Sequence, residues 1–373
     1  MPVSPNMAED LAAAVSSLYE QAELALIEMV TRALVEGLDS PLWVELKLAA
    51  LGNLRTAIEE IIAVLQVDAA GAMHQALAEA YERGQQAAIA ELGAVAVGPA
   101  FAAAEALPTA AAVDRLAAAL VSETGPVYAR ILRTGMDVYR QVIAEASSAP
   151  LLGATTRRQA AARALAKFAD RGVTGFVDRR GHAWNLTSYV EMATRSAVGR
   201  AAVQAHRDRL AAAGVDVVVV SDAPEECDRC KPWEGKVLRR EGPPGAGVVE
   251  MEHATEDGRM VRVRVAGSLP EARSKGLMHP NCRHTVSIYL PGLTRPPGPK
   301  RDRSRATYEQ SQQQRYLERQ VRAWKRRAAG AVEEKDRRAA NAKVRTYQAR
   351  IRELVAETGL TRKSHREQLT ASR

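Results

Sequence analysis

Aromatic side chains and cysteines are both scarce in this sequence. Phe, Trp and Tyr make up 4% of the 373 residues, and there are only three cysteines. The apolar fraction is rich in alanine, which favours closely packed helices over a sheet-rich core. An odd number of cysteines argues against a disulfide framework, so we expect a protein made in a reducing cytoplasm.

A secretory signal and a membrane-spanning segment are also missing. The start, MPVSPNMAED, has no basic region followed by an apolar run. The most apolar stretch, around residues 93–107, is interrupted by glycine, proline and glutamate. We therefore expect a soluble protein with no membrane partner.

Charge is present but distributed unevenly. Residues 295–373 contain 22 Lys and Arg against 9 Asp and Glu, a formal charge of +13, whereas residues 1–294 carry −5. A mildly acidic body with a strongly basic C-terminal segment is typical of proteins with a polyanionic partner, and nucleic acid is the first candidate. A solvated helical face is the alternative interpretation.

The three cysteines cluster around one short stretch of the chain. Cys227 and Cys230 lie in ECDRC, and Cys282 lies between His279 and His284 in MHPNCRH. Two thiols two residues apart, followed by a group of histidine, cysteine and histidine, are typical of a tetrahedral zinc site. We predict a structural Zn²⁺ held by the three cysteines and one histidine, and the spacing does not decide between the two histidines.

Other chemistry explains this cluster less well. A redox pair would open a helix in a βαβ unit, which Pro232, Trp233 and Gly235 do not allow, and a Cys–His catalytic pair would leave two thiols unexplained. HNH nucleases space their catalytic residues across a hairpin and a helix. Here the corresponding His279, Asn281 and His284 all lie within six residues. No catalytic triad order, phosphate loop or paired carboxylate motif is recognisable, so we expect no enzyme.

The predicted fold is mainly α with a small β-containing zinc-binding module (α+β). Residues 1–148 form an alanine-rich helical region with breaks at residues 37–41, 98–99 and 125–126. Residues 149–294 form the core with the metal module: helices over 155–171 and from about 186, and strands over 216–221, 236–239, 260–265 and 285–290. Residues 295–373 form a basic helical tail after a Pro-rich linker.

The tail has two helical stripes that point in opposite directions. One is apolar and contains Leu317, Val321, Trp324 and Ala328; the other is a row of arginines, namely Arg315, Arg319, Arg322 and Arg326. Such a row suits the phosphate backbone of double-stranded DNA. A second amphipathic helix carries Val344, Tyr347, Ile351 and Leu354, which predicts a helical hairpin, a self-association seam or a docking surface.

Three runs resemble a known family. VDRRGHAWNLTSYVEMATRS, VVVVSDAPEECDRCKPWEGKV and GLMHPNCRHTVSIYLPGLT, with QRYLERQVRAWKRR in the tail, look like the phage minor capsid protein 2 family, relatives of MuF-like head morphogenesis proteins. The likeness covers about residues 110–373. In related proteins the position matching His284 is often cysteine, which favours His284 as the fourth zinc ligand, although the His279-x-x-Cys282 spacing mirrors that of the first cysteine pair.

The resemblance implies a minor component of a tailed-phage head, assembled in the host cytoplasm and located in the virion. It also implies contacts with portal or capsid proteins and with packaged DNA. The alternative is a metal-dependent nuclease or hydrolase acting on DNA within the head. The sequence leaves open the copy number, the capsid surface contacted, the role of the N-terminal helices and whether the protein is ejected with the DNA.

Overall fold

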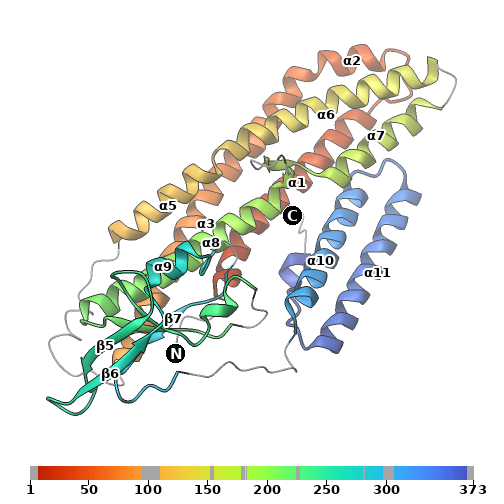
Figure 1. The fold of residues 1–373 in the computed structure, drawn as a ribbon. Helices are drawn as coiled ribbons and strands as arrows, with labels where there is room; N and C mark the ends of the chain where they lie inside the picture. Colours follow the sequence, from red (N-terminus) through yellow and green to blue (C-terminus); the bar gives the residue numbers. More distant parts are fainter. Residues whose placement is uncertain are drawn as a thin grey trace. The chain divides into compact units, whose positions relative to one another are not determined.

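The computed structural model describes residues 7–93, 110–151, 155–177, 181, 183–223, 227–279, 282–296 and 306–367. Helices account for most of these residues (Figure 1), which confirms the mainly α fold. The helices are α1 (Met7–Val35), α2 (Trp43–Ala49), α3 (Leu51–Gly93), α5 (Ala110–Thr124), α6 (Pro126–Leu151), α7 (Arg157–Arg171), α8 (Leu186–Ala212), α9 (Leu269–Ser274), α10 (Tyr308–Ala329), α11 (Glu334–Thr358) and the short η1 (Lys231–Trp233) and η2 (Ser364–Glu367). The strands are β1 (Thr174–Val177), β2 (Ala183–Asn185), β3 (Val217–Val220), β4 (Val237–Arg239), β5 (Gly247–Glu252), β6 (Met260–Val265) and β7 (Val286–Ile288).

The chain forms two compact units, each combining segments that are far apart in the sequence. The first unit contains Met1–Ala12, Met73–Leu120 and Met192–Tyr308, and the second contains Ala13–Ala72, Val121–Glu191 and Glu309–Arg373. The segments expected from the sequence, 1–148, 149–294 and 295–373, do not coincide with these units. The reason is that α1, α3 and α8 each contribute residues to both.

The N-terminal helices follow the predicted breaks where the structure describes them. Turn residues separate α1 from α2, and α6 begins at Pro126, whose fixed φ suits the first turn of a helix. The predicted break at residues 98–99 lies outside the described residues. The spacing of Leu48, Leu51, Leu54, Ile58, Ile62 and Leu65 predicts one buried helical face, and this is wrong for Leu48, because that residue belongs to α2 and is 49% exposed. The buried face of α3 starts later and contains Leu54, Ile58, Ile62 and Leu65.

Among the described helices, α3 is long and apolar enough to cross a membrane, judged by length and composition alone. This is weak evidence for a membrane span, because core helices of soluble proteins meet the same criteria. The expectation of no membrane partner stays a prediction.

A three-stranded antiparallel sheet in the first unit carries the metal module, with β3 between β4 and β7. All four valines of β3 are buried: Val218 and Val220 pack in one apolar cluster, and Val217 and Val219 in another. Burial on both faces explains the uninterrupted apolar run of this strand. The predicted strand over 260–265 is β6, and its antiparallel partner β5 was not predicted.

The two C-terminal helices form a helical hairpin in the second unit, as Figure 1 shows. Leu317 and Val321 of α10 pack against Val344, Ile351 and Leu354 of α11, with Trp324 and Tyr347 beside them. The predicted hairpin is thus confirmed. These side chains are packed within one chain, and self-association through the C-terminal helices stays a prediction.

Candidate metal centre and the arginine row

The first pair of cysteines lies on a tight turn that follows β3. The backbone N–H groups of Cys230 and Lys231 both donate to the Cys227 carbonyl, at 3.0 Å each. Gly235 closes the turn at φ +67°, and its N–H donates to the Val220 carbonyl at 3.1 Å. These bonds fix the two thiols at the end of a buried strand, as the sequence predicts.

The second half of the cluster lies between α9 and β7. A capping box of Ser268 and Glu271 starts α9. Beyond that helix, the Cys282 N–H donates to the His279 carbonyl at 2.9 Å, which makes a second short turn. The two turns therefore face each other in the first unit.

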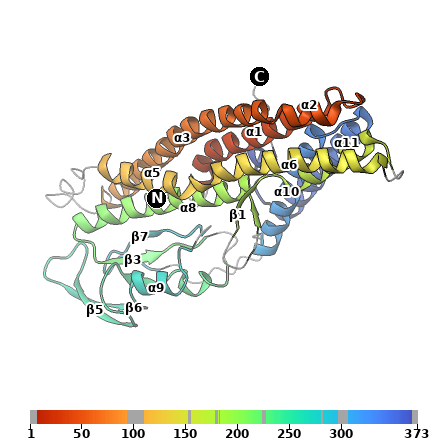
Figure 2. The ribbon, with the colours of Figure 1, turned by 90° about the horizontal axis from the view of Figure 1, so that it is seen from above.

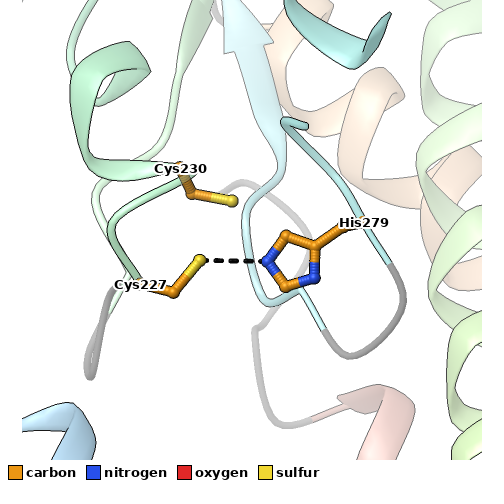
Figure 3. A group of neighbouring side chains, drawn as sticks. All are labelled: Cys227, Cys230 and His279. Carbon is orange, nitrogen blue, oxygen red and sulfur yellow. Dashed lines mark hydrogen bonds between the residues drawn. The ribbon is translucent and has the colours of Figure 1, made fainter. Parts of the chain in front are cut away.

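Five candidate donors converge in two overlapping groups. Cys227, Cys230 and His279 form one group, drawn in Figure 3, in which His279 Nε2 lies 3.0 Å from Cys227 Sγ. Cys230, Cys282 and His284 form the other, with Sγ atoms 3.5 Å apart and His284 Nδ1 3.4 Å from Cys282 Sγ. All five residues predicted from the sequence are thus brought together, and Cys230 joins the two groups.

These distances suit a zinc ion. Zn–S bonds of about 2.3 Å and Zn–N bonds of about 2.0 Å place neighbouring ligand atoms of a tetrahedron roughly 3.5–3.8 Å apart. The separations of 3.5 and 3.4 Å in the second group lie close to this range, whereas the 3.0 Å between Cys227 Sγ and His279 Nε2 is shorter. Cys230 is 1% exposed and belongs to the apolar cluster of the sheet, so the site is partly dry. The residues present therefore fit a zinc ion.

Glu234 is a functional residue that the sequence analysis missed. Its Oε1 atom lies 2.7 Å from His284 Nε2, on the opposite side of the ring from Cys282. Ligating histidines commonly bind a carboxylate through their second nitrogen, which fixes the ring and its tautomer. Glu226, which precedes Cys227 and would favour a catalytic site if it approached the metal, lies outside the described residues.

Hydrogen bonds and burial also set the charge of the thiols. The pKa of Cys282 is lowered to about 4, chiefly because it accepts a hydrogen bond from Cys230, with a further contribution from His284. The same bond raises the pKa of Cys230, and burial adds to that increase. Burial would lower the pKa of His284, but Cys282 and Glu234 together outweigh it and raise that pKa. The direction of these shifts favours the thiolate form of Cys282, which is the form that binds metal.

The arginine row of α10 is not a uniform solvent-exposed face. Arg319 is exposed and Arg315 is half-buried, whereas Arg322 and Arg326 are each 6% exposed. Arg322 Nη1 lies 3.4 Å from Glu20 Oε1. The expectation of four arginines facing solvent is therefore wrong for Arg322 and Arg326, which turn toward acidic side chains of the same unit.

Glu23 is the most buried of these acids, at 1% side-chain exposure. Its carboxylate accepts hydrogen bonds from the Val173 N–H at 2.7 Å and from Asn185 Nδ2 at 3.1 Å. Arg326 Nη1 lies 3.5 Å from the same carboxylate, and Arg326 Nε donates to the Ala169 carbonyl at 2.9 Å. Arg326 thus connects α10 to α1 and α7 inside the second unit.

Comparison with known proteins gives the family of the chain. The family described as "Phage minor capsid protein 2" matches residues 3–356. The chain belongs to this family. The match confirms the resemblance seen in the sequence. In this minor capsid protein 2 family member, it includes the whole cysteine–histidine cluster and the helical hairpin as far as residue 356.

A phage protein with a curated description is also similar. The "Structural protein" of Lactococcus phage LL-H is 27% identical to this family member over 245 residues, which cover 64% of this chain. The chain spans about 63% of the length of that relative. No solved structure matches the chain.

Proposed function

We propose that this chain is a non-enzymatic structural component of a tailed-phage head, located in the virion, in which a zinc ion holds the small β-containing module together. Membership of the minor capsid protein 2 family and the description of the phage LL-H relative support the structural role. The convergence of three thiols and two imidazoles at the end of β3 supports the zinc site.

The proposed ligands are Cys227, Cys230, Cys282 and His284. Glu234 favours His284 over His279, because a carboxylate on the far nitrogen orients the imidazole toward the metal. His279 would then donate a hydrogen bond to the Cys227 thiolate, with which it is in contact. When bound, zinc supplies coordination bonds that join the two turns, and such bonds add directly to folding stability.

Single substitutions at the two histidines test this ligand set. We expect His284→Ala to lower zinc content and thermal stability, and His279→Ala to retain most of the zinc. Zinc content and melting temperature are measured on the same samples. Retention of zinc by His284→Ala together with its loss from His279→Ala would reverse the assignment.

The competing function, a metal-dependent nuclease, predicts a different result. A catalytic zinc keeps a coordination position for water. Zinc-dependent cleavage of DNA that is lost in His279→Ala, with zinc content and melting unchanged, would favour that function over ours.

We also propose contacts with portal or capsid proteins and with the DNA backbone. For DNA, support comes from basic side chains on the exposed face of α11, namely Lys343, Arg345 and Arg352. DNA affinity falls with salt, and replacing these three by glutamine should make the slope of log affinity against log salt less steep by about 2 to 3. An unchanged slope would remove α11 from the DNA interface.

A further inference from the structure

A pocket in the first unit borders the candidate metal centre, and arginine side chains make up much of its lining. It has a volume of about 50 Å³, and four arginines line it: Arg195 and Arg200 from α8, Arg273 from α9, and Arg283 from the loop before β7. Ser196 and Thr285 add hydroxyl groups, and no carboxylate is among the lining residues. The pocket is therefore cationic.

Two of these arginines are held in place by one buried acid. Glu9 of α1 is 3% exposed, and its Oε1 atom lies 3.4 Å from Arg195 Nη1 and 3.0 Å from Arg283 Nη2. Glu9 therefore bridges the two guanidiniums. The shared bond also fixes both side chains, so little entropy is lost when they bind a ligand.

The other two arginines lack such a partner. In the described part of the chain, neither Arg200 nor Arg273 makes a hydrogen bond or ion pair with a carboxylate. Burial lowers the pKa of Arg273, and the positive charges of Arg207 and Arg200 lower it further. Like charges gathered on a concave surface are stabilised when an anion binds between them.

Size and charge define the ligand. A volume of about 50 Å³ has room for roughly four water-sized groups, which equals the number of oxygens on a phosphate. Four arginines and no carboxylate line the pocket, so its charge suits an anion. Guanidinium groups bind phosphate through paired N–H donors.

We propose that this pocket binds a phosphate group, either free phosphate or a phosphodiester of a nucleic acid. Arg200 and Arg273 supply guanidiniums that form no ion pair within the described residues, although Glu241 acts on Arg273 from further away, and Arg195 and Arg283 supply preorganised donors. This site goes beyond the proposed structural role and does not depend on zinc being the metal.

The test titrates the full-length protein with inorganic phosphate and, separately, with a short DNA duplex, using calorimetry. The variant is Arg200→Gln/Arg273→Gln, and the matched control is Arg262→Gln/Arg264→Gln, which removes two exposed charges from β6. All four positions are exposed, so the variants should fold, and circular dichroism checks this. We expect phosphate affinity to fall at least tenfold in the pocket variant and less than twofold in the control.

The duplex distinguishes the two sources. A phosphodiester ligand predicts that inorganic phosphate competes with the duplex, and that the pocket variant lowers the salt slope of duplex binding by about 2. Free phosphate as the ligand predicts phosphate binding without competition. Equal phosphate affinities for the wild type, the pocket variant and the control would overturn the proposal.

Discussion

Arg326 provides the sharpest test of how the basic α10 helix is used. In Arg326→Met, the buried Glu23 carboxylate keeps its hydrogen bonds from Val173 and Asn185 but loses its positive partner. Removing one member of a buried ion pair costs about 3–5 kcal/mol. The lost bond to the Ala169 carbonyl adds about 1 kcal/mol. Since two donors to Glu23 remain, we take the lower end of the ion-pair cost, about 3 kcal/mol, and expect a total loss of roughly 4 kcal/mol.

Thermal and urea unfolding, followed by circular dichroism, measure this loss against Arg319→Met. Arg319 lies on the same helix and is exposed, so its substitution should change stability by less than about 0.5 kcal/mol. The double variant Glu23→Gln/Arg326→Met removes both charges and should be more stable than the sum of the single effects predicts, by about 1–3 kcal/mol. Equal stabilities of Arg326→Met and Arg319→Met would refute the buried ion pair.

Further predictions concern pH, the hairpin and metal removal. Burial raises the pKa of Glu20 to about 8 although Arg322 opposes the shift, and Glu191 and Glu23 add to it. The folded state therefore keeps a proton that the unfolded chain loses near pH 4.5, so the free energy of unfolding should fall between about pH 5 and pH 8, by up to about 5 kcal/mol. Urea unfolding at several pH values should show a flatter dependence for Glu20→Gln, whereas substitution of the exposed Glu60 by Gln should leave it unchanged. The same pH dependence in both variants would contradict the raised pKa of Glu20. Ile351→Ala should cost about 2–5 kcal/mol because it empties the α10–α11 seam, and a loss below 1 kcal/mol would show that the seam is loosely packed. A chelator should lower the melting temperature of the wild type and leave that of Cys227→Ser nearly unchanged, and equal shifts would speak against Cys227 as a ligand.

Short-range patterns in the sequence predicted most elements of the fold. The four consecutive valines identified β3 because burial on both faces removes the usual alternation. β5 was not predicted, although Val249 and Met251 alternate with glutamates, because it closely follows a Gly-Pro-Pro-Gly sequence that is typical of a loop. β1 and β2 were not predicted either, since these strands are only four and three residues long.

Long-range partners could not be predicted in the same way. A helical wheel places Arg322 and Arg326 opposite the apolar stripe. It does not predict whether these arginines face solvent or a carboxylate about 300 residues away in the sequence. Glu20 and Glu23 lie three residues apart within the apolar pattern of α1. This spacing was the available signal that the helix buries two acidic side chains. Glu234 was equally hidden, because its partner His284 is 50 residues further along the chain. The candidate metal ligands were recognised because metal-binding chemistry is restricted to few residue types.

The zinc content of the purified full-length protein tests the central claim most directly. Elemental analysis by mass spectrometry should give one zinc per chain for the wild type and much less than one for Cys227→Ser and Cys282→Ser. A wild-type protein that folds with the same melting temperature and contains no zinc, even after dialysis against zinc, would contradict the account.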